Sequence, residues 1–503
     1  MDKYQNFIDG RWCDPSSQKW LDNRDPATGD TIGMYPRSGL ADIEKAVSAA
    51  RKAQESWRWT PPPVRAQFLL RAADFLKSNI DVFSEELCRE MGKPIAECRG
   101  DVQEAIDMAI FCAGEGRRNL GMVTSSEIPN RTVIAFREPL GVVGAITPWN
   151  FPMGMPAWKV MPALITGNAV ILKPAEDTPH SAINLIRAFE HAGLPPGVLN
   201  LVSGLGEEAG KALVAQEGVD AISFTGSTEV GTSIAERCPR QFKRVALEMG
   251  GKNAVIVLDD ADVDLAVKGI VRSVFGMAGQ RCTSAGRIIV DRQIAEPLTE
   301  KLIEAANGLR LGKGLDEDTE IGPIINETRL SNIHRDVLEA LDQGATLLCG
   351  GERATEGELK KGYFYKPTLL SNVMPDMKIA QEETFGPVAS IIPFNDLTGA
   401  LRITNDVKYG LSAAVYTNSL DKAMFFAHRV RVGAFFINTA CVGAELQLPF
   451  GGMKASGNGR REGAHHMLDI YTEWKTVAIQ QKDLAYVETQ KESYGSQTQN
   501  TAL

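Results

Sequence analysis

Short apolar runs alternate with amphipathic segments over most of the chain. From residue 141 onward the apolar runs are 142–146 (VVGAI), 168–173 (NAVILK), 198–203 (VLNLVS), 220–226 (DAISFTG) and 244–250 (RVALEMG). Each run is bounded by Gly, Pro or Asn, and the segments between them have apolar residues at helical spacing. Strands that alternate with helices predict a parallel sheet with both faces covered.

A second series of apolar runs follows after residue 282, so the sequence predicts a second α/β unit. Its runs are 286–291 (GRIIVD), 345–351 (ATLLCGG), 388–394 (VASIIPF), 411–417 (LSAAVYT) and 434–439 (AFFINT). Before both series, residues 63–91 carry apolar side chains at helical spacing and predict a pair of helices.

Two segments fit neither series because they alternate like exposed strands. They are residues 131–138 (RTVIAFRE) and 471–480 (YTEWKTVAIQ). Exposed strands need a partner edge. We expect these two to pair outside the main units and to take part in oligomerisation, as a homodimer or homotetramer; an ordinary local hairpin is the alternative. The end of the chain, residues 486–503, is expected to be a polar tail.

The composition is that of a globular protein with more than one core. A chain of 503 residues exceeds the ~250 to 300 residues at which single cores stop growing. The net charge of −9 disfavours nucleic acid and anionic membrane surfaces as partners. Residues 139–158 are uncharged but contain four prolines, so we expect no membrane-spanning helix there.

The eight cysteines form no CxxC pair and no regular framework. Together with an N-terminus that lacks a secretory signal pattern, this predicts reduced thiols in a cytoplasmic protein. No metal-ligand spacing is visible, so no metal is expected.

Polar or ionisable residues follow four of the predicted strands. An open parallel sheet binds ligands at the carboxyl ends of its strands. Those ends carry Thr147 to Asn150, Lys173 to Glu176, Thr225 to Ser227, and Glu248. Each alone fits a structural turn, but the joint arrangement favours a binding site.

Two of these strand ends suit a dinucleotide. GSTEVG (226–231) opens a helix after a glycine turn, and the amides and dipole of a helix N-terminus suit a phosphate. It is not GxGxxG, and a second cluster, Gly204 to Gly206, fits a structural turn. Lys173 and Glu176 could bind ribose hydroxyls. A carboxylate there would repel a 2′-phosphate, which favours NAD over NADP.

Six motifs stand in the order and approximate spacing of the NAD(P)-dependent aldehyde dehydrogenase superfamily, which the chain resembles from about residue 5 to 480. They are TPWNFP with KPAE, FTGSTEVG, LEMGGKN, GQRC, EETFGPV and LPFGGMKASG. The resemblance implies a Rossmann-like cofactor domain (1–122 and 140–251), an α/β catalytic domain (252–450) and a small β oligomerisation arm (123–139 and 468–485).

The resemblance also implies irreversible oxidation of an aldehyde to a carboxylic acid through a cysteine thiohemiacetal and thioester. Cys282 of GQRC would be the nucleophile, and Asn150 would stabilise the developing alkoxide beside the backbone N–H of Cys282. Glu248 would be the base for the hydrolytic water; a structural carboxylate paired with Lys252 is the alternative. Lys159 would join a proton relay with Glu248.

The remaining implied roles concern NAD. Ile146 and Trp149 would lie along the adenosine and phosphate path beside Thr147, and Thr225, Gly226 and Ser227 would lie at the pyrophosphate. Glu383 and Phe385 of EETFGPV would hold the nicotinamide ribose and flank the ring, with a solvated turn and core packing as the respective alternatives. NADP is possible but less favoured.

Two sequence details bear on the chemistry. Many relatives read Gly-Arg-Glu after the SG turn, whereas this chain reads Gly-Arg460-Arg461-Glu462, which is expected to place Arg461 where the relay glutamate would stand. Arg281, beside the nucleophile, could promote thiolate formation only if it pointed inward, which is not expected.

The substrate is less constrained. The loop 437–452 (INTACVGAELQLPFGG) resembles that of dehydrogenases acting on 2-oxoglutarate semialdehyde. Succinate semialdehyde enzymes often carry an arginine six residues before the nucleophile, where this chain has Gly276. A buried substrate carboxylate needs a cation. Either another residue supplies it or the substrate is larger or neutral. We expect a semialdehyde of an oxo or related acid, and a broad-specificity enzyme or another semialdehyde dehydrogenase is the alternative.

Three other classes are disfavoured. A coenzyme A-acylating dehydrogenase would usually lack Glu248. A non-catalytic structural member would be free to lose Cys282, Asn150 or Glu248, and all three are present. A Cys-His hydrolase would need a histidine near the thiol, and the sequence ties none of the six to Cys282.

Overall fold

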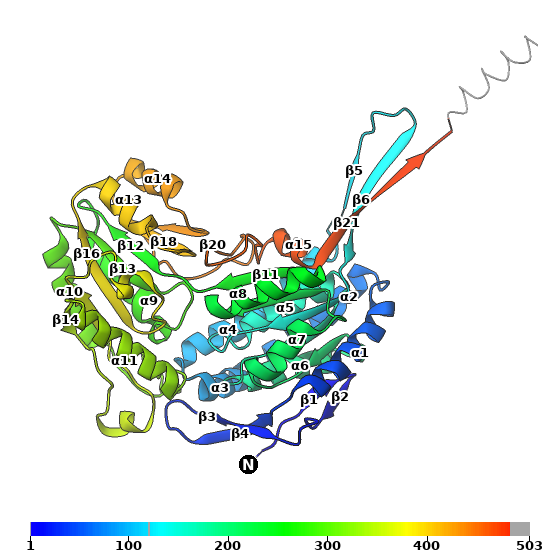
Figure 1. Ribbon diagram of the computed structural model, residues 1–503, viewed down its shortest axis with the longest axis horizontal. Coiled ribbons are helices and arrows are strands. Elements are labelled where there is room, and N and C mark those ends of the chain that lie inside the picture. The colour runs from blue at the N-terminus through cyan, green and yellow to red at the C-terminus, as the bar shows by residue number, and fades with distance from the viewer. Residues whose placement is uncertain (1, 119–120, 483–503) are drawn as a thin grey trace, which may run out of the picture.

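The computed structural model describes residues 2–118 and 121–482, so the tail predicted at 486–503 lies outside the described residues. Two seven-stranded sheets, each covered by helices on both faces, lie side by side, and a three-stranded antiparallel sheet projects from one end (Figure 1). The predicted α/β fold with two units and a small β arm is therefore confirmed.

The first sheet holds the run of strands predicted from residue 141. In spatial order it contains β11 (Arg244–Met249), β10 (Ala221–Gly226), β7 (Val142–Ile146), β8 (Ala169–Lys173), β9 (Leu199–Leu201), β1 (Asn6–Ile8) and β2 (Arg11–Cys13). The strands from β11 to β9 are parallel, and β1 joins β9 antiparallel. The carboxyl ends of β11, β10, β7 and β8 consequently meet at one rim.

Alternate positions of the first sheet pack against different helices. On β8, Val170 and Leu172 belong to one buried cluster, whereas Ala169 and Ile171 belong to another. The first cluster includes α2 (Pro62–Ser78), α3 (Ile80–Met91), α4 (Ile95–Glu115), α5 (Gly154–Ile165) and α6 (Pro179–His191). The second includes α1 (Leu40–Trp57), α7 (Lys211–Ala215) and α8 (Thr228–Arg237). Helices α2 and α3 are the predicted pair at 63–91.

The second sheet repeats this arrangement. Its order is β14 (Thr346–Cys349), β15 (Thr368–Ser371), β16 (Val388–Phe394), β13 (Ala285–Asp291), β12 (Asn253–Val257), β18 (Ser412–Tyr416) and β19 (Ala434–Ile437). Only β14 runs antiparallel to its neighbour. One face packs on α9 (Val263–Phe275), α10 (Ala295–Gly308) and α11 (Glu327–Asp342), and the other on α13 (Leu397–Asn405) and α14 (Leu420–Arg429).

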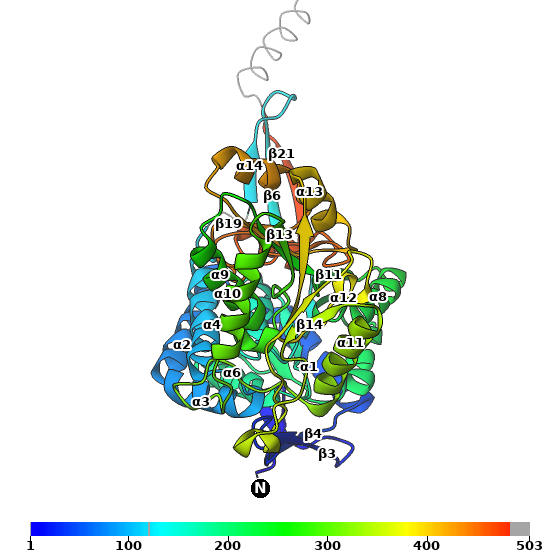
Figure 2. The ribbon, with the colours of Figure 1, turned by 90° about the vertical axis from the view of Figure 1, so that its left-hand side faces the viewer.

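The two segments that alternate like exposed strands pair with one another. The arm sheet has the order β21 (Thr472–Gln480), β6 (Arg131–Pro139) and β5 (Gly121–Thr124). It carries exposed apolar side chains, among them Val123, Trp474 and Ile479. A second small sheet, β3 (Trp20–Arg24) with β4 (Thr31–Pro36), lies at the opposite end of the molecule (Figure 2).

Short elements complete the chain: β17 (Tyr409–Gly410), β20 (Met453–Lys454), α12 (Lys378–Gln381) and α15 (Leu468–Tyr471). Among the described residues, no helix is both long and apolar enough to cross a membrane.

Candidate active site

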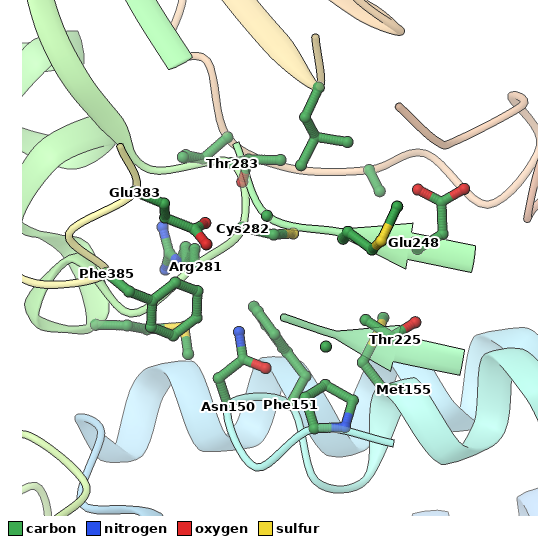
Figure 3. A pocket seen from close by; sticks show the side chains of 18 of the residues that line it. Asn150, Phe151, Met155, Thr225, Glu248, Arg281, Cys282, Thr283, Glu383 and Phe385 are labelled. Atoms are coloured by element: carbon green, nitrogen blue, oxygen red, sulfur yellow. The ribbon is translucent and has the colours of Figure 1, made fainter. Parts of the chain in front are cut away.

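A cavity of about 1020 Å³ is lined by residues from both sheets. Nine of the predicted site residues line it: Trp149, Asn150, Thr225, Gly226, Ser227, Glu248, Cys282, Glu383 and Phe385. In Figure 3, Cys282 reaches in from above and Asn150 from below, with Glu383 and Phe385 on one side and Glu248 on the other. Residues up to 366 positions apart in the sequence, from 96 to 462, thus surround one space.

Cys282 lies in the turn between α9 and β13 and is partly exposed to the cavity. The side chain of Asn253 holds this turn by donating to the backbone oxygens of Cys282 (2.7 Å) and Ser284 (2.9 Å). Enclosure in the protein, together with the nearby charges of Glu383 and Glu248, raises the pKa of the thiol to about 12. Without further help the sulfur is therefore a neutral thiol at neutral pH.

Gly279 allows the cysteine turn to approach the EETFGPV loop. Its φ is +69°, and a Cβ there would lie 2.1 Å from the carbonyl oxygen of Gly386. Any larger residue would push these two backbones apart. The glycine of GQRC thus sets the distance between the nucleophile and the loop that carries Phe385.

Asn150 follows β7 and is 4% exposed. Its side-chain amide donates one hydrogen bond, of 2.9 Å, to the backbone oxygen of Gln280. The amide has a second N–H. Gln280 is itself buried and fixed, because its side chain bonds Met277, Pro323 and Ile325 backbone groups. The donor predicted for the alkoxide is therefore tied to the segment that carries the nucleophile.

Glu248 ends β11 on the opposite side of the cavity and is also 4% exposed. One carboxylate oxygen accepts from the backbone N–H of Gly452 at 3.1 Å, and the other has no hydrogen-bond partner among the described residues. Burial and the charge of Glu462 raise the pKa of Glu248 well above its ordinary value. The alternative pairing with Lys252 does not form: the Lys252 ammonium lies 3.4 Å from the hydroxyl of Thr384.

The relay position differs from the sequence-based expectation. Lys159 forms a buried ion pair of 2.5 Å with Glu462, so Glu462 stands at the relay position where Arg461 was expected. The Arg461 guanidinium donates instead to the backbone oxygen of Gly452. The expectation that an arginine stands at this place is wrong, because Glu462, and not Arg461, points inward and reaches Lys159. Glu462 lines the cavity, whereas Lys159 lies behind it.

The polar ends of β8 and β10 lie on the same rim as the cavity. Ser227 caps α8 by accepting from the N–H of Val230. The side chains of Lys173 and Glu176 form an ion pair of 3.0 Å. Burial tends to raise the pKa of Glu176, but the Lys173 ammonium outweighs it and holds that pKa below its ordinary value. Glu176 is therefore a carboxylate at neutral pH.

Four of the predicted cofactor residues, Ile146, Thr147, Lys173 and Glu176, lie outside the cavity lining, on the adjacent ends of β7 and β8. The backbone of Thr147 donates to that of Lys173.

Glu383 and Phe385 occupy the second-sheet side of the cavity. Glu383 accepts from the backbone N–H of Gly251 at 3.0 Å, and a Cβ on Gly250 would lie 1.9 Å from this carboxylate. Burial raises the pKa of Glu383 to about 7. Phe385 has φ +53°, which is uncommon for a bulky residue, and its ring meets that of Trp149 edge-on at 5.4 Å. Glu383 is thus bound to a backbone N–H rather than solvated in a turn, and Phe385 lines the cavity rather than packing in a core.

A dinucleotide fits these features. The cavity extends from a capped helix N-terminus at Ser227, which suits phosphate, to the carboxylate of Glu383, which can accept from ribose hydroxyls. The ring of Phe385 at that end offers an apolar face.

Arg281 lies against the cavity, contrary to expectation. Its side chain is only 13% exposed and forms an ion pair of 2.9 Å with Glu97 of α4. The guanidinium occupies the space beside Gly276, where a Cβ would lie 2.9 Å from it. The expectation failed because Glu97, on α4, supplies a partner that the local sequence does not reveal.

The sequence did not reveal a set of buried side chains that line the cavity or lie behind it. They are Lys93, Asp101, Asn253 and Gln280. Asp101 stands in a polar stretch, RGDVQE, whereas Lys93, Asn253 and Gln280 are polar residues in apolar or glycine-rich surroundings, such as MGKPI for Lys93. A polar residue in such surroundings is the signal that could have identified these three.

A family model described as aldehyde dehydrogenase family matches residues 12–477. The chain belongs to this family. It is 40% identical over 477 residues to alpha-ketoglutaric semialdehyde dehydrogenase of Bacillus subtilis, covering 95% of this chain and 98% of the relative. It is 39% identical to alpha-ketoglutarate semialdehyde dehydrogenase of Haloferax volcanii, covering 95% and 99%.

The fold of this aldehyde dehydrogenase family member matches a solved structure. The crystal structure of betaine aldehyde dehydrogenase from Staphylococcus aureus in complex with NAD+ has a TM-score of 0.93 and 33% identity, covering 96% of each chain.

Proposed function

We propose that the protein catalyses NAD-dependent oxidation of a semialdehyde that carries a carboxylate, such as 2-oxoglutarate semialdehyde, to the corresponding acid. The observation that carries the proposal is the convergence of Cys282, Asn150 and Glu248 on one cavity. Asn150 and Cys282 come from loops of different sheets that are joined by the hydrogen bond from Asn150 to Gln280, and Glu248 lines the same cavity.

In the first step the Cys282 sulfur adds to the aldehyde carbon, so that a C–S bond forms and the carbonyl oxygen becomes an oxyanion. The free N–H of the Asn150 amide and the backbone N–H of Cys282 donate to this oxyanion. The unpartnered oxygen of Glu248 is suited to accept the thiol proton, since the raised pKa of this carboxyl makes it a stronger base.

Glu383, Phe385, Ser227, Thr225, Gly226, Trp149 and, on the adjacent rim, Ile146, Thr147, Lys173 and Glu176 would hold the dinucleotide. When bound, the nicotinamide would supply a positive charge and the capacity to accept hydride from the substrate carbon. The ionised Glu176 favours NAD because it would repel a 2′-phosphate.

In the last step a water attacks the thioester on Cys282. Glu248 takes the water proton, the C–S bond breaks, and the thiolate leaves with the acid as product. Lys159 and Glu462 lie next to Glu248 and would pass that proton on.

Arg281 supports a carboxylated substrate. Its Nε–H is buried and has no hydrogen-bond partner among the described residues, although Nη2 is bound to Glu97. An unpaired guanidinium donor that lines the cavity suits a carboxylate. Arg281 thus supplies the cation that position 276 lacks.

The other carboxyl groups of the α4 wall do not oppose an anionic substrate. Asp101 is paired with Lys93. Burial and the charge of Asp101 raise the pKa of Glu104 to about 7, and the side chain of Trp158 donates to it at 2.7 Å. Near or below neutral pH this wall therefore carries little net negative charge.

A panel of aldehydes assayed for NAD reduction tests the proposal. We expect carboxylated semialdehydes to be preferred over uncharged aldehydes of equal length, and Arg281→Met to raise KM for the former by about tenfold, the worth of a lost charged hydrogen bond. An uncharged aldehyde should be unaffected. Equal rates for charged and uncharged aldehydes in the unmodified protein would refute the substrate class, and no NAD reduction with any aldehyde would refute the function.

We also propose that the arm sheet joins copies of the chain in a homodimer or homotetramer. Its exposed Val123, Trp474 and Ile479 support this, since isolated antiparallel strands with exposed apolar residues are stabilised by pairing. Light scattering with size exclusion would test it, and a monomer at micromolar concentration would contradict it.

A further inference from the structure

Behind Asn150 lies a buried ion pair that the proposed chemistry does not use. The Lys93 ammonium and the Asp101 carboxylate are 2.8 Å apart, and both side chains are fully buried. Lys93 precedes α4, and Asp101 lies in its second turn. A buried pair of this kind is costly to desolvate and is weak evidence for stability alone, so its contacts indicate what it does.

Both partners of the pair form hydrogen bonds to the backbone of the loop that carries Asn150. Lys93 Nζ donates to the backbone oxygen of Asn150 at 3.1 Å and lies 4.4 Å from the ring centre of Phe151. The second oxygen of Asp101 accepts from the backbone N–H of Gly154, the first residue of α5, at 2.6 Å. The loop between β7 and α5 is therefore fastened at its middle, Asn150, and at its end, Gly154, by one ion pair.

The side chain and the backbone carbonyl group of Asn150 point in different directions. Its carbonyl oxygen faces Lys93, whereas its amide faces the cavity and donates to Gln280 beside Cys282. Holding the carbonyl fixes the direction of the peptide, and with it the direction in which the amide projects. An oxyanion donor has its effect only if it is already aimed where charge develops.

We infer that Lys93 and Asp101 are positioning residues, which hold Asn150 in the orientation needed to stabilise the oxyanion. The inference rests on the proposed function only in so far as Asn150 is the oxyanion donor. It assigns neither residue a contact with substrate or with the reacting atoms.

The inference predicts non-additive losses. In Lys93→Met/Asp101→Asn, both charges are removed and an acceptor for the Gly154 N–H remains, but the Asn150 carbonyl loses its donor. A small displacement of a reacting group can cost up to about 10²-fold in rate. We expect the double variant to lose about tenfold in rate when Asn150 is present. It should lose less than about twofold when Asn150→Ala has already removed the donor, because interacting residues share one effect.

The measurement is hydrolysis of p-nitrophenyl acetate by the full-length chain, alongside aldehyde oxidation. An activated ester needs only a thiol, an oxyanion donor and water, so it is independent of the cofactor and of the unknown aldehyde. Equal losses in both Asn150 backgrounds, or no loss in either, would overturn the inference. Non-additive ester kinetics without oxidation of any aldehyde would uphold it while refuting the proposed function.

Lys243→Met is the matched control. Lys243 is also a buried lysine that donates to backbone oxygens, those of Val214 and Gln216, but it does not line the cavity. We expect its removal to lower the melting temperature without the non-additive kinetic signature. If the control gave the same kinetic pattern, the pattern would reflect general loosening and the inference would fail.

Discussion

The two walls of the cavity hold their functional side chains by different means. On the first-sheet wall, buried ion pairs stand behind the site, Lys93 with Asp101 and Lys159 with Glu462. On the second-sheet wall, Cys282 and its neighbours are held by close backbone approach and by amide side chains. No buried ion pair backs the cysteine turn there, among the residues that the structure describes, apart from Arg281 with Glu97 across the cavity.

The two walls should therefore be sensitive to different kinds of substitution. Removing one partner of a buried ion pair costs about 3–5 kcal/mol, because the other charge is left unpaired. A wall built on close backbone contact is sensitive to added atoms instead, since two backbones cannot yield as a side chain can. Charge changes should therefore affect mainly the first wall, and added methyl groups mainly the second. The predictions below test this contrast from the largest expected effect to the smallest.

Cys282→Ala should abolish aldehyde oxidation and leave NAD binding intact. The sulfur is the only atom of the second wall that forms a bond in the proposed chemistry, and loss of a nucleophile typically costs about 10⁴-fold or more. Stopped-flow absorbance measures the turnover and calorimetry the NAD affinity.

Cys441→Ala is the control for that variant. Cys441 is a buried thiol that lies 3.3 Å from the backbone oxygen of Thr283, next to the nucleophile. Oxidation should persist in it. Turnover that survives in Cys282→Ala would end the proposed mechanism.

Glu248→Gln should stop the reaction after the thioester has formed. The amide keeps the size of the side chain and cannot take the proton of the attacking water, so turnover should fall by about 10²- to 10⁴-fold. Mass spectrometry of the protein mixed with substrate and NAD should detect the acyl adduct on Cys282. An unmodified mass with slow turnover would show that this variant blocks transfer of the thiol proton to Glu248 rather than attack of water on the thioester.

The sequence was sufficient for the architecture and for nine of the residues that line the cavity. The alternating runs after residues 141 and 282 predicted both sheets, because parallel strands buried on two faces are uniformly apolar. Cys282, Asn150 and Glu248 lie together as their motifs implied. Glu248 lies near the end of β11, Asn150 in the loop after β7 and Cys282 in the turn before β13, where the strand boundaries restrict the direction of each side chain.

The partners of the buried charged groups could not be predicted, because they are remote in the chain. Lys159 and Glu462 are 303 positions apart. The register of the loop after Gly459 decides whether Arg461 or Glu462 points inward, and no local pattern sets it. The prediction that Arg281 would not point inward was wrong for the same reason, since Glu97 lies on α4 and only tertiary packing brings it near Arg281.

Gly279→Ala tests the second wall. A methyl group at this position would lie 2.1 Å from the Gly386 carbonyl oxygen, and φ is +69°, so the cysteine turn or the Phe385 loop must shift. Because a shift of about 1 Å can cost 10²-fold, we expect kcat to fall by about 10- to 100-fold. Gly308→Ala, at the end of α10 with no atom near its added methyl group, should retain full activity. Equal activity of the two variants would show that the backbone contact does not place the nucleophile.

Glu462→Gln should shift a pH profile rather than remove activity. Burial and then the charge of Glu462 raise the pKa of Glu248. Without that charge, and with the Lys159 ammonium no longer neutralised, the pKa of Glu248 falls, so its basic form persists to lower pH. The acid limb of the kcat profile should therefore move to lower pH, while the rate at high pH changes by only about threefold, as expected for a slightly weaker base.

Glu445→Gln removes an exposed carboxylate from the nearby loop, where its contact is with Gln447, and should leave the limb in place. A shift to higher pH, or the same shift in both variants, would contradict the coupling between Glu462 and Glu248. The first-sheet wall would then not differ from the second in its sensitivity to charge.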